Sequence, residues 1–179
     1  MRKNIVISIW GMFILFGFVS LYVYANKVDK QVLSLKDVMQ LAKNGKYNEA
    51  IEEIKQIIKQ KPDKENVEAH LGLGLIYYKI KQYENALDEF VKTAEIKRNS
   101  PMAYYFMGLI YEKKAISEID KMTAKDMKRK ALKAWQNYLG CDHKKEMKEA
   151  HRNIGITVKE SIKRAKRHIK MLQEDLDNE

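Results

Sequence analysis

From Lys27 onward, hydrophobic and polar positions follow the period of α-helices. In residues 49–59 the apolar side chains recur at steps of three and four, the spacing of one buried helix face. Asn44-Gly45 predicts a left-handed stop for the preceding helix, and Lys61-Pro62 predicts the end of the helix between them. No stretch of the sequence sustains alternation with a period of two. The pattern therefore predicts an all-α fold.

Two further helix starts are marked by capping residues. Ser100 followed by Pro101 has the order of an N-cap and a first helical residue. Thr123 with Asp126 three residues later has the spacing of a capping box. Gly140 would then close the helix that Thr123 opens.

The N-terminal segment differs from the rest because residues 5–24 carry no charge. At about 1.5 Å per residue such a helix spans roughly 30 Å, the thickness of a bilayer core. The alternative is a signal peptide cleaved after Val23-Tyr24-Ala25, but the apolar region of a signal is usually shorter. We expect residues 1–26 to be a transmembrane anchor or an uncleaved signal, and the protein to be a single-pass membrane protein.

Membrane orientation is weakly specified by charge. Two basic residues precede the apolar segment, and three lie within the first dozen residues after it. A short N-terminal tail usually stays inside while a long domain is exported. We therefore expect the soluble domain to be extracytoplasmic, in the periplasm of a bacterium.

Self-comparison of the sequence reveals an internal repeat. Leu73-Gly74-x-x-Tyr77 recurs as Met107-Gly108-x-x-Tyr111 at an offset of 34 residues. Gly45-x-Tyr47-x-x-Ala50 recurs as Lys81-x-Tyr83-x-x-Ala86 at an offset of 36. Ala86-x-x-x-Phe90 recurs as Ala131-x-x-x-Trp135 at 45, one repeat unit plus 11 residues. The two glycines predict close helix contacts that the aromatic residues fill.

These motifs resemble the tetratricopeptide repeat family, in which a Leu-Gly-x-x-Tyr helix precedes an Ala-x-x-x-Phe helix. The resemblance covers residues 27–140 as repeats at about 31–64, 67–100 and 101–140. It implies an α-solenoid of about three helical hairpins that binds proteins. The first repeat departs from the signature, with Asp37-Val38 in place of Leu-Gly. The third carries an insertion around residues 115–125, which should lengthen both of its helices.

Residues 141–179 are predicted to end the array as a long basic capping helix. One apolar stripe at three- and four-residue spacing consists of Val158, Ile162, Ala165, Ile169, Leu172 and Leu176. The basic surface around it consists of Lys159, Lys163, Arg164, Lys166, Arg167 and Lys170.

The positive charge lies in the C-terminal third of the chain, since residues 113–170 contribute +11 to a net charge of +10. A basic surface attracts anionic lipid, an acidic protein or nucleic acid, and it does not choose among them. Lysines outnumber arginines 28 to 6, and no aromatic residues are interleaved in a base-reading motif. We therefore expect nucleic acid to be an unlikely partner.

Candidate chemistry is sparse. Cys141-Asp142-His143 with His151 lacks the four converging ligands that zinc requires. His70 lies on the predicted buried side of its helix and should be packed rather than catalytic. Nothing matches a nucleophile elbow or a phosphate loop. We expect no enzyme activity, no metal and no cofactor.

The resemblance also implies a concave groove along the first helix of each hairpin. Carried over by spacing, its lining would be Leu35, Met39, Leu71, Leu75, Tyr78, Tyr105, Phe106 and Leu109. The competing interpretation is that these residues face neighbouring helices. We expect an adaptor or assembly scaffold that binds a helix or an extended apolar segment of a partner protein. The alternative is a protein that self-assembles, or associates with anionic lipid through its basic helix, and organises a surface.

Overall fold

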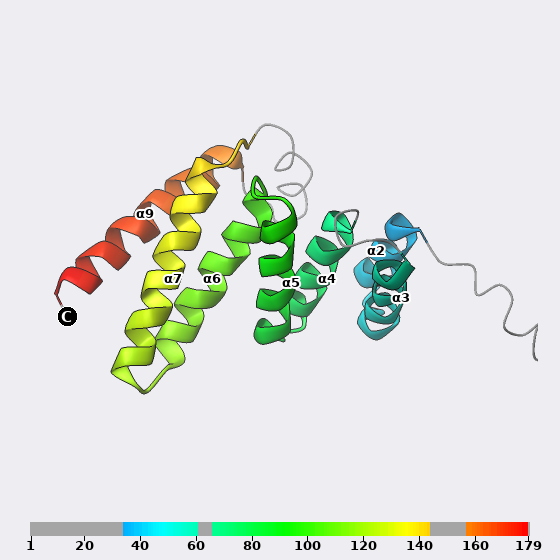
Figure 1. The fold of residues 1–179 in the computed structure, drawn as a ribbon, viewed down its shortest axis with the longest axis horizontal. Helices are drawn as coiled ribbons and strands as arrows, with labels where there is room; N and C mark the ends of the chain where they lie inside the picture. The colour runs from blue at the N-terminus through cyan, green and yellow to red at the C-terminus, as the bar shows by residue number, and fades with distance from the viewer. Residues whose placement is uncertain (1–33, 61–65, 144–156, 179) are drawn as a thin grey trace, which may run out of the picture. The chain divides into compact units, whose positions relative to one another are not determined.

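The computed structural model describes residues 34–60, 66–143 and 157–178. The chain divides into two units, Met1–Ser34 and Leu35–Glu179, and every described helix belongs to the second unit. The described residues contain seven helices and no strand (Figure 1). The helices are α2 (Leu35–Lys43), α3 (Tyr47–Gln60), α4 (Val67–Lys79), α5 (Tyr83–Ile96), α6 (Pro101–Ser117), α7 (Lys121–Gly140) and α9 (Val158–Asp177).

The helices pack as three consecutive hairpins, α2–α3, α4–α5 and α6–α7, followed by α9 against α7. This arrangement confirms the predicted all-α, solenoid-like fold. In the described part of the chain no helix is both long and apolar enough to cross a membrane. The predicted anchor, residues 1–26, lies outside the described residues, as does His151.

The first two hairpins turn in the same way. Gly45 has φ of 80° and Lys81 has φ of 65°, and these positions are 36 residues apart in the repeat. In the first turn Lys46 N–H donates to the Leu41 carbonyl and Gly45 N–H to that of Ala42. Gln82 and Lys81 make the matching bonds to Tyr77 and Tyr78. This is the Schellman ending that Gly45 predicted, and in the second hairpin a lysine adopts it.

The third hairpin is longer, as the insertion predicted. Helices α6 and α7 have 17 and 20 residues, against 13 and 14 in α4 and α5. The predicted cap of α7 is wrong, because Asp120 is the N-cap and Thr123 is already inside the helix. The Asp120 carboxylate accepts bonds from the Thr123 backbone N–H at 2.7 Å and its hydroxyl at 2.6 Å, which lowers the pKa of Asp120.

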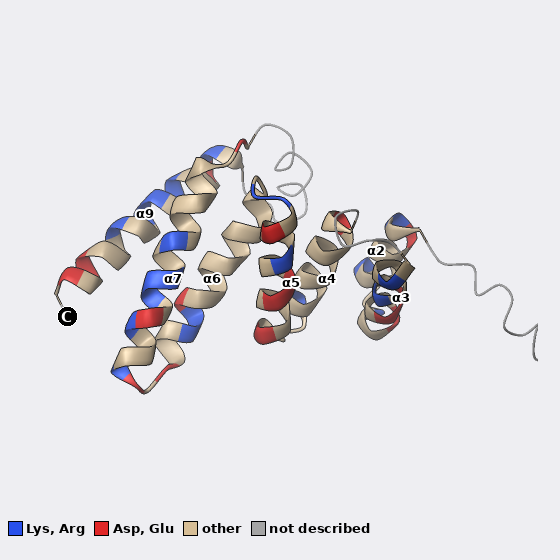
Figure 2. Cartoon of the chain, in the orientation of Figure 1, with Lys and Arg blue, Asp and Glu red and all other residues tan. Residues whose placement is uncertain are grey.

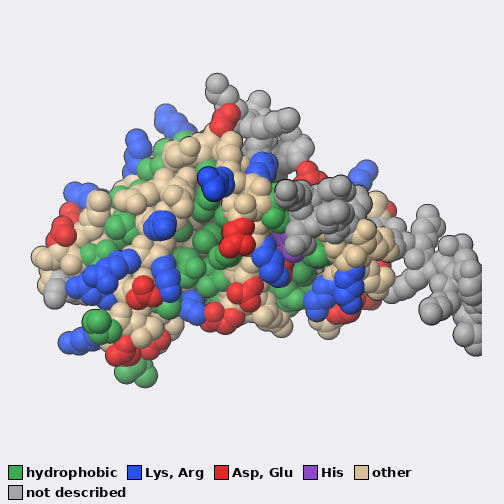
Figure 3. All heavy atoms as spheres, viewed as in Figure 1, with side chains coloured by type: hydrophobic (Ala, Val, Ile, Leu, Met, Phe, Trp, Pro, Cys, Tyr) green, Lys and Arg blue, Asp and Glu red, His purple; other side chains and the backbone are tan. Residues whose placement is uncertain are grey.

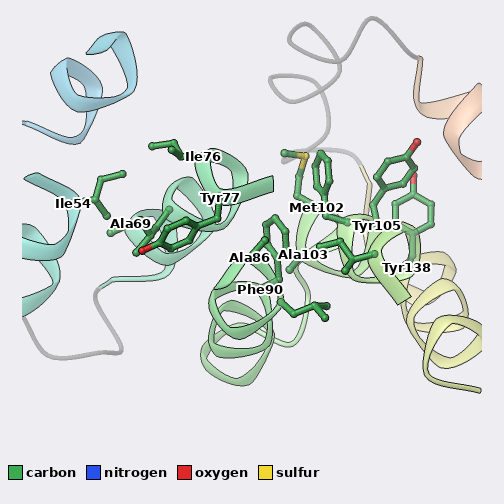
Figure 4. Packing of buried hydrophobic residues seen from close by; sticks show 14 of the residues in the cluster. Ile54, Ala69, Ile76, Tyr77, Ala86, Phe90, Met102, Ala103, Tyr105 and Tyr138 are labelled. Carbon is green, nitrogen blue, oxygen red and sulfur yellow. The ribbon is translucent and has the colours of Figure 1, made fainter. Parts of the chain in front are cut away.

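The close helix contacts lie at the repeated glycines. A Cβ placed on Gly74 would lie 2.7 Å from Phe90 Cε1, and one on Gly108 would lie 2.6 Å from Trp135 Cε2. Real Cβ atoms essentially never approach this closely, so each glycine admits the aromatic ring of the second helix in its hairpin. Figure 4 shows Phe90 among the buried residues of α4, α5 and α6. The glycine and aromatic positions of the repeat are therefore confirmed as packing partners.

Helix α9 packs with the predicted stripe inward. Ser161, Ala165 and Leu172 are buried, and Val158, Ile162 and Ile169 lie half-buried against the core. The Tyr138 and Ser161 hydroxyls are 2.7 Å apart, so a hydrogen bond links α9 to α7. His168 stacks on Trp135 with ring centroids 4.9 Å apart. These contacts make α9 an integral part of the second unit.

Candidate functional site

An apolar groove of about 440 Å³ lies on the side formed by the first helices of the three hairpins. Its walls come from α2, the start of α3, the last turns of α4 and the first turns of α6. The lining residues are Met39, Ala42, Lys43, Tyr47, Leu75, Ile76, Tyr78, Lys79, Met102 and Phe106. This volume is in the range of protein pockets that bind ligands.

The groove exists because α4 and α6 are apolar on more than one face. Leu73, Ile76 and Tyr77 of α4 point into the core, while Leu75 and Tyr78 of the same helix remain half-buried. A helix that is apolar all round must either be covered on every side or offer a surface to something else. Figure 4 shows Ile76 on α4 and Met102 on α6, two of the residues that line the groove.

Aromatic rings hold one wall of the groove in place. The Tyr78 ring meets Phe106 edge-on, with centroids 4.7 Å apart, and Tyr83 at 5.7 Å. Phe106 in turn stacks on Phe90 at 5.5 Å, which ties this wall to the core. Burial raises the pKa of Tyr78 further above physiological pH, where a tyrosine phenol is already neutral. Half-buried Tyr78 thus presents an apolar ring and a neutral hydroxyl, the properties of an interface anchor.

The charge of the groove has one sign. Lys43 and Lys79 are the only charged residues of the lining, and both are exposed. Each is the last residue of the first helix in its hairpin, and the two are 36 residues apart. Neither is paired with an acidic side chain among the residues that the structure describes. An apolar floor with a cationic rim favours a segment that combines apolar and acidic side chains.

Of the eight groove residues predicted from the sequence, the structure brings four together. Met39, Leu75, Tyr78 and Phe106 line the groove. Three others, Leu35, Leu71 and Leu109, are half-buried against the core and lie outside the lining.

Adjacent Tyr105 and Phe106, both predicted to line the groove, are both buried. Their exposed fractions are 3% and 6%. Helix α6 has neighbours on two sides, and the two side chains, about 100° apart, face different ones. Phe106 packs on α4 and α5, whereas Tyr105 packs on Trp135 and Tyr138 of α7. Tyr105 is therefore a core residue.

Sequence reasoning missed the groove residues Ala42, Lys43, Tyr47, Lys79 and Met102. A signal for three of them was present. The offset of 36 that relates Gly45 to Lys81 also relates Lys43 to Lys79, and Tyr47 to Tyr83. Extending both copies of the repeat by two residues toward the N-terminus would have found the lysine pair.

The predicted basic surface is exposed at all six positions on α9. Figure 2 shows basic positions along the ribbon of α9, with acidic positions near its end. Two of the six have partners: Arg164 Nη1 donates to the Tyr105 hydroxyl at 3.0 Å, and Lys170 lies 3.6 Å from Glu174. The surface therefore offers several cations to solvent while one arginine helps to fix the helix.

Outside the groove, the polar residues considered for chemistry make hydrogen bonds within the fold. His70 is buried, as predicted, with Nδ1 2.6 Å from Glu89 Oε2. Glu89 also accepts from Lys92 Nζ at 2.9 Å. Cys141 donates to the Asn137 carbonyl at 3.2 Å. Within the described ranges no group of three or more His, Cys, Asp or Glu residues could hold a metal ion.

Part of the chain matches a known family model. Residues 41–110, from the end of α2 to within α6, match the family model for the tetratricopeptide repeat. No curated protein matches the chain significantly. A solved structure titled "MamA MSR-1 C2" is similar, with 20% identity over 84% of this chain and 80% of that chain and a TM-score of 0.44.

Proposed function

We propose that this protein, with its tetratricopeptide repeat match over residues 41–110, is an adaptor or assembly scaffold that binds a partner protein in the groove. The observation that carries the proposal is the groove itself: an apolar lining on the first helices of the hairpins, with lysines as its only charges. Repeat folds of this kind stack simple hairpins to build extended binding surfaces. A helix or an extended segment with apolar anchors and nearby acidic residues suits this lining.

The proposal includes attachment to a membrane through residues 5–24 and an extracytoplasmic, periplasmic position for the helical unit. The support is the length of the uncharged segment, which is sufficient to span a bilayer core. Tethering would confine the groove near a membrane and raise its effective concentration toward partners in the same membrane.

Replacing Tyr78 with alanine should weaken partner capture at least tenfold. Aromatic anchors in interface pockets typically contribute about 2 kcal/mol or more, which exceeds the roughly 1.4 kcal/mol of a tenfold change. Tagged full-length protein would be purified from solubilised membranes, and the co-purifying proteins quantified by mass spectrometry. Tyr104→Ala is the matched control, because Tyr104 is also a half-buried tyrosine but lies outside the groove. Equal recovery of every partner with Tyr78→Ala would show that the groove is not the binding surface.

The exposed cations of α9 support a second candidate function, association with an anionic lipid surface. Changing Lys163, Lys166, Arg167 and Lys170 together to glutamate should reduce binding of residues 27–179 to phosphatidylglycerol vesicles. The free energy of unfolding should change by less than about 1 kcal/mol, because exposed charges contribute little to stability. Cosedimentation at two salt concentrations measures the binding. If the unmodified domain binds phosphatidylcholine vesicles equally well, the lipid candidate is wrong.

A further inference from the structure

The turn between α6 and α7 displays the most exposed large apolar residues of the described chain. The exposed fractions are 87% for Ile116, 96% for Ile119 and 75% for Met122. In Figure 3 apolar side chains stand out at the end of this hairpin, which we call the α6–α7 tip (residues 116–122). Apolar side chains gathered at such exposure mark interaction sites more often than chance.

The backbone of the tip is held in one conformation. Glu118 Oε1 accepts from the backbone N–H groups of Ile119 at 3.0 Å and Asp120 at 3.2 Å. Asp120 in turn caps α7 through Thr123. The tip therefore presents Ile119 on an ordered turn, so docking it would require little loss of backbone entropy.

Acidic residues flank the apolar apex. Glu118 and Asp120 lie on either side of Ile119, and Figure 2 shows acidic residues at this turn. Lys121 follows Asp120, so two acidic residues and one lysine leave the tip with a net charge of −1. The groove has the opposite pattern, with an apolar floor and Lys43 and Lys79 as its only charges. The tip and the groove thus match in both apolar character and charge.

We propose that the α6–α7 tip of one copy of this protein docks in the groove of a second copy. The proposal rests on the groove of the proposed function and assigns it one occupant. Ile119 enters the apolar lining, and Glu118 and Asp120 approach Lys43 and Lys79.

The tip cannot reach the groove of its own chain. Phe106, which lines the groove, and Ser117, the last residue of α6, belong to the same helix. At about 1.5 Å per residue they are roughly 17 Å apart along its axis. Since α6 and α7 pack against each other along this length, the tip cannot fold back. The occupant therefore comes from another molecule.

A contact between two different surfaces of the same protein is heterologous. A docked pair still has one free groove and one free tip, so copies add in a row unless the rotation closes a ring. This property allows a decisive test with two variants of the full-length protein. Ile119→Asp disables the tip, and Lys43→Glu with Lys79→Glu disables the groove. All three positions are exposed, so the folded unit should be retained.

The experiment co-produces two differently tagged full-length chains, extracts them in mild detergent and measures how much of one is recovered with the other. Two tip variants together, or two groove variants together, should show at least tenfold lower recovery than two unmodified chains. One tip variant with one groove variant should recover a dimer, because one intact groove and one intact tip remain. Lys59→Glu in both chains is the control, since Lys59 is exposed in the last turn of α3 and belongs to neither the groove lining nor the tip.

Co-recovery that no variant changes, loss of recovery in the mixed pair, or no recovery of unmodified chains would each overturn the proposal. The proposed function is tested separately. Ile119→Asp leaves the groove intact and should still capture other partner proteins, with Tyr78→Ala as the comparison. If capture depends on Tyr78 while self-docking fails, the adaptor function stands and the second copy is excluded as occupant. If self-docking holds and capture ignores Tyr78, the groove serves only other copies.

Discussion

Replacing Trp135 with alanine should lower the free energy of unfolding by about 3–5 kcal/mol, the range for truncating a large buried aromatic side chain. Trp135 is fully buried, and its ring contacts Tyr105 and Tyr138 edge-on and His168 face-on. Its indole N–H donates to Glu112 Oε1 at 2.7 Å. A single truncation therefore opens a cavity among α6, α7 and α9 and removes a hydrogen bond between two helices.

Urea unfolding of residues 27–179, followed by far-UV circular dichroism, measures this loss. Leu132→Ala is the comparison on the same helix, because Leu132 is only half-buried and should cost less. A loss below about 1 kcal/mol for Trp135→Ala would mean that this ring does not fill the space between the helices.

Gly108→Ala should be the most damaging single-methyl change in the chain, at about 1–3 kcal/mol. Alanine ordinarily favours a helix over glycine by about 1 kcal/mol, so the expected sign is opposite to helix propensity. The reason is steric: the added Cβ would lie 2.6 Å from Cε2 and 2.8 Å from Cδ2 of Trp135, a rigid buried ring that packs against Tyr105, Tyr138 and His168. The same urea titration measures the effect.

Gly140→Ala is the matched control, since its added Cβ meets nothing within 4 Å. The double variant Gly108→Ala, Trp135→Ala provides the sharper comparison. With the indole removed, the alanine at position 108 should become neutral or stabilising, which a double-mutant cycle reports as coupling. If the two losses in the free energy of unfolding simply add, the strain does not arise between residues 108 and 135.

The parts of the fold that could be predicted are those that the repeat encodes locally. Gly74 and Gly108 predicted close contacts with Phe90 and Trp135 because a missing side chain and a large ring recur at fixed spacing. The left-handed stop at Gly45 was predicted from residue type alone. The cap of α7 was not predicted. The spacing of Thr123 and Asp126 suggested a capping box, but the Thr123 backbone N–H donates to the Asp120 carboxylate instead.

The site was harder to predict because it depends on what each helix faces. Adjacent Tyr105 and Phe106 look equally suited to a groove in the sequence. Only the packing of α6 between α4 and α7 assigns Tyr105 to the core and leaves Phe106 at the groove wall. The α6–α7 tip was visible as an insertion, but its exposure depends on how far the lengthened helices extend.

The two ends of the helical unit are held together unequally, and this affects how the groove would respond to an occupant. Around α6, α7 and α9 the core contains three mutually contacting rings with a fourth, His168, stacked on Trp135, whereas α2 buries a single side chain, Val38. In a stack where each hairpin contacts only its neighbours, local opening is easiest at the weakly held end. The groove wall formed by α2 can therefore move more easily than the wall formed by α6. An occupant that contacts α2 would order the N-terminal hairpin. The conformational entropy lost in this ordering would lower the affinity of the occupant.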